Sequence, residues 1–466
     1  MTIFGSFEIG RKALKANHKG MEVSGQNVAN ANTPGYSRQR ANLESVVHPI
    51  VVGPSMAPGQ GVKVTNVERM HSEFYHSQMI KTGSHRSYWE MRQETYNTAE
   101  AIFMEPDDYG INKYLTDFFD SWHELSSSPE ETAVRSALRE HAVTLTSSVQ
   151  DVYMRLQDVR LDKQDEMEMR IEEVNRILDV ISELNDKLRF VDALQQQSNE
   201  LHDQLDLAIE ELSEMLDIQV YRKESGAVDI FSGGRLIIQE SRALHLELKP
   251  AEEDNHLQVV NYRGVPLNIN AGRIAGLLDA INLDIPDIQN SLDNVVTTMV
   301  TEINALHRTG YGLNQTEELA IDFFTPLDET TSAAMQFQVA DDVLEDSSNV
   351  AASSQPGEPG NGEMALEIAR LRDHRQAERL HGGSVMEYYR GMITSMGVQA
   401  QESERMAETF KRTEAEIIEL NRSVSAVNID EEMLNMTQYQ HSWHAAARYL
   451  NTVDEMLTVL FTELGR

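Results

Sequence analysis

The chain has 466 residues, and its 40 Lys and Arg residues against 75 Asp and Glu residues give a formal net charge of −35. A surface this acidic repels the phosphates of nucleic acids and of anionic lipids, which argues against nucleic-acid binding. The absence of cysteine excludes disulfides and thiolate metal sites. The sequence has no run of about 18 apolar residues, so we expect no membrane insertion. Residues 1–20 also lack the apolar core of a cleaved secretory signal.

The N-terminal segment predicts an amphipathic helix that ends at a turn. Phe7, Leu14, Met21 and Val28 recur every seven residues, and they form a narrow apolar seam that needs a partner. A run follows whose motif residues are Asn27, Asn30, Asn32, Thr33, Pro34, Gly35 and Tyr36. Asparagine caps helix ends, and the Pro-Gly pair suits a type II turn, in which Gly35 needs a positive φ. An ordinary helix end explains the Pro and the Gly but not the full run.

Residues with catalytic or metal-binding potential are few. His71 and His76 are five residues apart, a spacing that does not place two ligands on one helix face, and His123 lacks the second histidine of an HExxH motif. Residues 59–61 (Gly-Gln-Gly) have two glycines of a phosphate loop, but they are predicted to form a turn before the strand-like residues 62–64. We therefore expect no catalytic, cofactor-binding or metal site.

A stretch without Gly or Pro, residues 130–225, predicts long packed helices. Its apolar residues repeat every seven positions, and Ser198 is the one position at which the repeat fails. A single helix of this length would extend about 140 Å. We therefore expect one or more breaks or a hairpin, at a place that the residues do not specify.

The periodicity changes to strand-like alternation over residues 217–270, which predicts a small antiparallel β unit inserted among helices. A helix is expected to start again at Pro286, because proline is favoured in the first helical turn, and to stop at Gly310. Residues 345–362 are rich in Ser, Pro and Gly, and they predict an exposed loop or linker.

The C-terminal segment carries a second regular seam. Its residues are Ile429, Met436, Trp443, Leu450, Leu457 and Leu464, and the positions three residues further on are apolar except for Glu432. Two stripes in this register predict a coiled coil, so we expect the two termini to pack together and to be completed by neighbouring subunits. The alternative is two unrelated amphipathic helices on a globular core.

The run from Asn27 to Tyr36, placed after an amphipathic helix, resembles the signature of the flagellar rod, hook and hook-associated proteins. Further blocks, in the same order along the chain, narrow the resemblance to the hook-associated protein 1 family. They are residues 36–39 (YSRQ), 102–106 (IFMEP), 115–122 (LTDFFDSW), 302–312 (EINALHRTGYG), 427–432 (VNIDEE), 438–440 (QYQ) and 452–457 (TVDEML). The resemblance is weakest over residues 313–385.

The residue patterns and the resemblance agree on a mainly α fold with a β insertion. It has terminal helices that form an N/C coiled coil, a long-helix body and a small antiparallel β unit. The expected domains are a terminal coiled-coil assembly domain (1–64 plus 401–466), a helical body (65–216 plus 271–400), the β unit within it (217–270) and a reduced, loop-rich variable region (313–385).

The resemblance implies a structural subunit, and no enzyme, that self-assembles at the tip of the hook and joins the hook to the filament. The implied partners are further copies of the chain in a ring, the hook protein, the second hook-associated junction protein and a flagellar export chaperone. The implied location is extracellular, at the hook–filament junction of the bacterial flagellum, reached by type III export without a cleaved signal peptide. Two alternatives stay open: a coiled-coil scaffold without a flagellar role, and an enzyme with an unrecognised carboxylate site.

Overall fold

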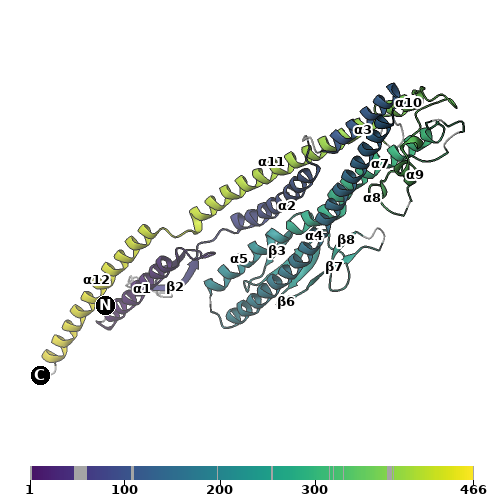
Figure 1. Ribbon diagram of the computed structural model, residues 1–466. Coiled ribbons are helices and arrows are strands. Elements are labelled where there is room, and N and C mark those ends of the chain that lie inside the picture. The colour runs from purple at the N-terminus through teal and green to yellow at the C-terminus, as the bar shows by residue number, and fades with distance from the viewer. Residues whose placement is uncertain are drawn as a thin grey trace.

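The computed structural model describes residues 3–46, 60–105, 110–196, 198–252, 256–313, 315–317, 320–328, 330–374, 380 and 382–464. The molecule is elongated, with the N-terminal and C-terminal helices together at one end (Figure 1). Long helices dominate, and the described strands form three small antiparallel sheets, so the prediction of a mainly α fold with a β insertion is confirmed. None of the described helices combines the length and apolar character needed to cross a membrane.

One end of the molecule is built from both termini. Its elements are α1 (Ile3–Asn30), β1 (Gln39–Ser45), β2 (Val62–Arg69) and α12 (Ile429–Leu464). Helix α1 lies beside α12, and the antiparallel β1–β2 hairpin packs on α1. We call these elements the terminal unit.

Two pairs of long helices form the body (Figure 1). Helix α2 (Glu73–Phe103) packs along α11 (Val385–Ser425), and α4 (Thr132–Ala193) packs against α5 (Asn199–Met215). The chain reverses direction between α4 and α5, so the long helical stretch predicted from the sequence breaks between these two helices. Ser198, the position at which the seven-residue repeat fails, is the N-cap of α5. Serine is common at this position, although the Ser198 side chain forms no capping hydrogen bond here.

The β insertion consists of two antiparallel sheets instead of one. The first contains β3 (Ile218–Arg222), β4 (Val228–Ser232), β5 (Arg235–Gln239) and β6 (Arg242–Ala243), and the second contains β7 (Leu246–Pro250) and β8 (Leu257–Asn261). Ile230 and Val259 are fully buried in the same apolar cluster as Leu178 and Ile181 of α4. The two sheets therefore share one core with the second half of α4.

The helix that was expected to start at Pro286 begins earlier. Helix α6 (Arg273–Asp279) continues through a π-helical turn (Ala280–Asp284) into α7 (Ile285–His307). Pro286 lies in the first turn of α7. Because proline lacks an N–H group, it cannot donate a regular helical hydrogen bond, and the wider turn before it accommodates that loss.

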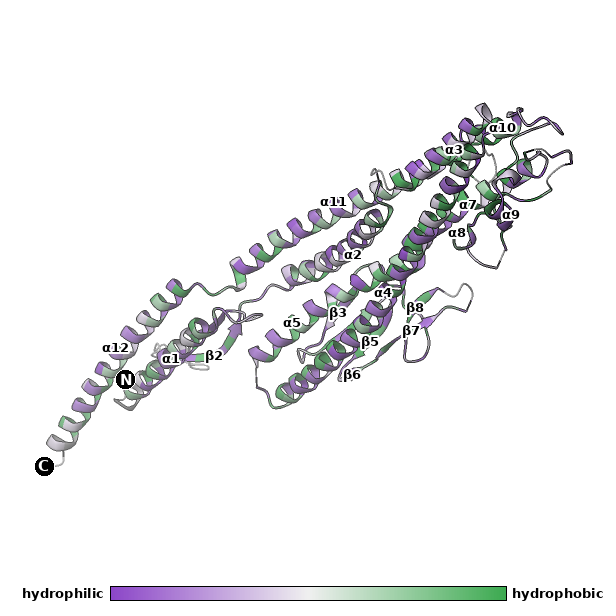
Figure 2. Cartoon of the chain, viewed as in Figure 1, coloured by the Kyte–Doolittle hydropathy of each residue, from purple (hydrophilic) through white to green (hydrophobic). Residues whose placement is uncertain are grey.

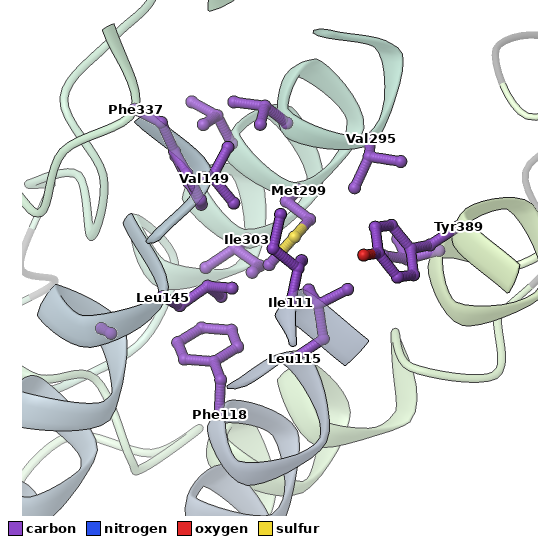
Figure 3. Packing of buried hydrophobic residues seen from close by; sticks show 14 of the residues in the cluster. Ile111, Leu115, Phe118, Leu145, Val149, Val295, Met299, Ile303, Phe337 and Tyr389 are labelled. Carbon is purple, nitrogen blue, oxygen red and sulfur yellow. The ribbon is translucent and has the colours of Figure 1, made fainter. Parts of the chain in front are cut away.

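The far end of the molecule has its own apolar core. Helices α3 (Ile111–Ser127), α4, α7 and α11 converge on it, as Figure 3 shows for Phe118, Leu145 and Ile303. The short helices α8 (Ala333–Gln336), α9 (Asp341–Glu345) and α10 (Glu363–Arg370) and a 3-10 turn (Ser347–Asn349) cover it.

The expectation of an exposed linker at residues 345–362 is wrong for its central part. Val350, Ala351 and Ala352 are fully buried, because this part packs into the core at the far end. Arg135, which is also buried, donates hydrogen bonds from Nη1 to Val350 O (2.6 Å) and from Nε to Pro129 O (2.8 Å). These bonds satisfy backbone carbonyls that burial would otherwise leave without a partner.

Two of the expected domain boundaries differ from the structure. Helix α11 runs without interruption to Ser425 along α2, so residues 401–425 belong to the body. Strand β2 extends to Arg69, so the hairpin passes beyond residue 64. Both boundaries depend on pairing between segments that are far apart in the sequence, which periodicity does not report.

Candidate assembly unit at the paired termini

Small residues let the two terminal helices approach closely. A Cβ atom at Gly10 would lie 2.7 Å from Leu450 Cδ2, and one at Gly20 would lie 2.7 Å from Tyr439 Cε1. The order of these contacts makes α1 and α12 antiparallel. The two glycines therefore act as sockets for the larger side chains of α12, as small residues do wherever helix backbones pack tightly.

The seam residues named from the sequence flank this contact line. Half-buried side chains are those of Leu14, Met21, Val28, Met436, Trp443, Leu450 and Leu457. Phe7 and Ile429 are 41% and 47% exposed, and the side chain of Leu464 lies outside the described residues. Deeper burial occurs at Ala446 and Val453, in the companion stripe of α12. The seven-residue repeat therefore indicates the correct side of each helix but not its most buried line.

A row of large apolar side chains on α12 stays exposed in the single chain. It comprises Ile429, Met433, Leu434, Tyr449, Met456, Val459 and Leu460, each at least 40% exposed. Figure 2 shows hydrophobic and hydrophilic positions interleaved along α12. A concentration of apolar side chains on one exposed helix indicates an interaction surface.

Asn27 holds the chain that leaves α1. Its side chain is fully buried, and Nδ2 donates to Gln39 O (2.8 Å). Its Oδ1 accepts from Gln39 N (2.9 Å) and from the Tyr36 hydroxyl (2.9 Å). Burial, with the nearby Asp203 carboxylate, raises the pKa of Tyr36 to about 12, so this hydroxyl keeps its proton and donates at neutral pH. The Asn27 amide thus holds the end of α1 against Tyr36 and the start of β1.

The rest of the motif forms the expected turn. Tyr36 N donates to Thr33 O (3.2 Å), and Gly35 has a φ of 75°, so the prediction of a positive φ at this glycine is confirmed. Thr33 Oγ1 donates to Asn30 Oδ1 (3.3 Å). Asn32, Thr33, Pro34 and Gly35 are exposed at the tip of the turn. The motif thus combines one buried anchor with an exposed tip.

Arg38 and Glu432 form the contact that the sequence analysis missed. Arg38 Nε donates to Glu432 Oε1 (2.8 Å), and Arg38 Nη2 donates to Glu431 Oε1 (2.7 Å). Glu432 is only 2% exposed. In the sequence, Glu432 is the one charged residue among the apolar positions of the companion stripe. Its ion pair with Arg38 explains why a charged residue stands there. The backbone N–H of Arg38 also donates to Ser425 O (2.9 Å), which connects the turn to the end of α11.

The turn and the hairpin are also attached to α5 of the body. Ser37 N donates to Asp203 Oδ2 (3.2 Å). Arg69 donates to Asp203 Oδ1 (3.0 Å) and to Asp206 Oδ2 (2.6 Å), and all three side chains are nearly buried. Burial raises the pKa of Asp206, but the positive side chains packed around it, Arg222 and Arg69 among them, outweigh burial and lower that pKa to about 2. Asp206 is therefore ionised and paired at neutral pH.

The remaining candidates from the sequence do not form a catalytic site. His123 is exposed on α3, with no partner arranged for proton transfer among the described residues. Gly59 lies outside the described residues. Gly61 has a φ of 86°, and a Cβ atom there would lie 3.3 Å from Ile9 Cα, so it serves the packing of the hairpin on α1.

Comparison with known protein families matches three regions of the chain. Residues 96–324 match the family "Flagellar hook-associated protein FlgK helical domain". Residues 7–36 match "Flagella basal body rod protein", and residues 423–461 match "Flagellar basal body rod FlgEFG protein C-terminal". The last two regions cover α1 with its turn and most of α12, which the structure brings side by side.

Curated proteins and a solved structure agree with these matches. The chain is 27% identical to flagellar hook-associated protein 1 of Bacillus subtilis over 99% of this chain and 98% of that protein. It is 24% identical to the protein of the same name from Escherichia coli, over 67% of this chain and 58% of that protein. The flagellar hook junction protein FlgK from Burkholderia pseudomallei has the same fold, with a TM-score of 0.63 and 12% identity, over 75% of this chain and 100% of that one. The chain is therefore similar to flagellar hook-associated protein 1 along almost its whole length.

Proposed function

We propose that this chain is a structural subunit of the bacterial flagellum that self-assembles at the tip of the hook and joins the hook to the filament. The observation that carries the proposal is the incomplete burial of the terminal unit. Helix α12 packs along α1, and its exposed row of large apolar side chains stays uncovered in the single chain.

The exposed row supports assembly with further copies of the chain. Burying apolar surface contributes about 25 cal/mol for each Å² removed from water. Side chains such as Leu434 and Met456, which are both 58% exposed, gain this free energy only when another molecule covers them. A ring of identical subunits supplies an equivalent terminal unit to each neighbour. The long body then lies on the outside of the ring.

The proposed partners follow the order of the junction. The hook protein lies on one side, and the second hook-associated junction protein lies on the other. An export chaperone binds the chain before secretion, because the exposed row on α12 would otherwise allow assembly inside the cell. Export proceeds through the flagellar type III apparatus without a cleaved signal peptide, and the mature chain is extracellular.

The chain acts mechanically and not as an enzyme. The charged groups that lie together at the boundary of the terminal unit, among them Arg69, Asp203 and Asp206, are paired with one another. Such pairing suits a joint that transmits force between the terminal unit and the body. A coiled-coil scaffold without a flagellar role would need neither the buried Asn27 anchor nor the turn from Thr33 to Tyr36.

Electron microscopy of cells that lack this protein tests the proposal. We expect hooks without filaments and flagellin released into the medium, with both defects restored by the gene on a plasmid. Normal filaments in the deletion strain would contradict the proposed function.

A further inference from the structure

Two histidines and a glutamate meet where the hairpin joins the body. His71 lies in the loop before α2, Ser72 is the N-cap, and Glu73 and His76 lie in the first two turns of the helix. The expectation that His71 and His76 are misplaced for a shared site assumed that both lie on one helix. Because His71 precedes the helix, the spacing rule does not apply, and the two ring centroids are 5.3 Å apart. A ligand nitrogen of each imidazole and a carboxylate oxygen of Glu73 all lie within 4.8 Å of one another.

The two imidazoles carry nitrogen atoms without hydrogen-bond partners. His71 Nε2 and His76 Nε2 are both buried, and neither forms a hydrogen bond with any residue that the structure describes. His76 is only 3% exposed. The closest carboxylate oxygens are Glu73 Oε1, at 3.6 Å from His71 Nε2, and Glu210 Oε1, at 3.4 Å from His76 Nε2. A buried polar atom without a partner costs free energy, so these nitrogens call for a ligand.

The charges around the cluster favour a divalent cation. The neighbouring ionised groups are the carboxylates of Glu73, Asp203, Asp206 and Glu210 and the guanidinium groups of Arg69 and Arg222. Four negative and two positive charges leave an excess of two negative charges when the imidazoles are neutral.

We propose that His71, Glu73 and His76 bind one divalent transition-metal ion, with Glu210 of α5 as the fourth ligand. Zn²⁺ accepts imidazole nitrogen and carboxylate oxygen in tetrahedral sites, with bonds of about 2.0–2.1 Å and therefore about 3.3 Å between ligand atoms. The separations of 3.4 and 3.6 Å between imidazole nitrogens and carboxylate oxygens are close to this value. The Glu73 side chain is 64% exposed, and its carboxylate is paired with Arg222.

The arrangement also provides outer contacts of the kind that orient metal ligands. Arg222 Nε donates to Glu73 Oε2 (3.0 Å), and His71 Nδ1 lies 3.6 Å from Asp206 Oδ2. Such contacts fix the orientation of imidazole and carboxylate ligands. A bound ion would link the loop after β2 and the start of α2 to α5. Metal binding would thereby stiffen the boundary between the terminal unit and the body.

Calorimetric titration of the metal-free full-length protein with Zn²⁺ tests this site. We expect one Zn²⁺ per chain and a melting temperature that rises with the Zn²⁺ concentration, because an ion that binds only the folded state stabilises it. Replacing the exposed ligand, Glu73→Gln, should weaken binding at least tenfold without affecting the fold. His76→Ala should abolish stoichiometric binding, and circular dichroism reports whether this buried substitution keeps the helices.

His123→Ala is the matched control, because His123 is exposed on α3 and distant from the cluster. It should bind Zn²⁺ as the unmodified chain does. The proposal is wrong if the unmodified chain takes up no Zn²⁺ or if Glu73→Gln binds as tightly as the unmodified chain. It is equally wrong if His123→Ala weakens binding as much as Glu73→Gln does.

Discussion

Replacing Asn27 by alanine tests whether the motif after α1 works through one buried anchor. The substitution removes three hydrogen bonds, two with the backbone of Gln39 and one with the Tyr36 hydroxyl. Gln39 is 5% exposed, so water does not readily replace the lost partner. Each buried group left without a partner costs about 1–3 kcal/mol. We expect a total loss of about 3 kcal/mol in the local stability of the terminal unit.

Hydrogen exchange measures this loss where it occurs. A change of about 3 kcal/mol corresponds to a roughly 100-fold larger open population, since every 1.4 kcal/mol is about tenfold. Amides of residues 27–45 should therefore exchange roughly 100-fold faster in Asn27→Ala. Amides of the core at the far end, such as that of Leu145, should keep their exchange rates because they belong to a separate cluster.

Asn32→Ala is the control within the same motif. Asn32 is exposed and forms no hydrogen bond with any residue that the structure describes. We expect its exchange rates to match those of the unmodified chain within about 0.5 kcal/mol, as for other surface substitutions. Equal effects of Asn27→Ala and Asn32→Ala would refute the assignment of Asn27 as the anchor.

Three further substitutions or conditions have defined outcomes. Gly35→Val should lower the free energy of unfolding by about 1 kcal/mol or more, because the positive φ of Gly35 is strained for valine. Steric contact is not the cause, since a Cβ atom there would lie at an ordinary 3.4 Å from Leu207 Cβ. An unchanged thermal melting curve would contradict this prediction. Glu432→Gln removes the charge that faces Arg38. It should lower the local stability of the turn, measured by amide hydrogen exchange, by about 1–2 kcal/mol. Unchanged exchange rates would show that the ion pair is dispensable. Burial lowers the pKa of His307 to about 4, so the unfolded chain binds more protons between about pH 6.5 and 4, and stability is lost as the pH falls through this window. Between pH 7 and pH 5, the free energy of unfolding should fall by about 2 kcal/mol more in the unmodified chain than in His307→Gln. The same pH dependence in both proteins would contradict the lowered pKa of His307.

The sequence is most informative where a pattern is local. The seven-residue repeats that include Leu14 and Leu450 predict two helices with one apolar side each, and the structure packs these helices together. Gly35 is equally readable, because a Pro-Gly pair in a turn has few backbone solutions. Both features depend on residues close together in the chain, where steric and periodic constraints are strong.

Contacts across long sequence separations could not be read in the same way. Arg38 and Glu432 are 394 residues apart, and nothing local assigns one to the other. Glu432 was noticeable only as a charge within an apolar stripe. The pairing of α2 with α11 is similarly distant, which is why the start of the terminal unit was placed too early at residue 401. The spacing of His71 and His76 was read as helical, although the helix begins between them, so the sequence did not indicate that the two imidazole rings lie close together.

The most direct test of the central claim is filament attachment by the variant Leu450→Arg in a strain that lacks the native gene. Leu450 packs on Gly10 at the contact between α1 and α12, and a large apolar side chain contributes roughly 2–3 kcal/mol at such a site. Because every subunit repeats the fault, we predict hooks without filaments, although thermal unfolding of the body is unchanged. Normal filaments would contradict assembly through the paired termini, and so would a loss of helix that amounts to complete unfolding.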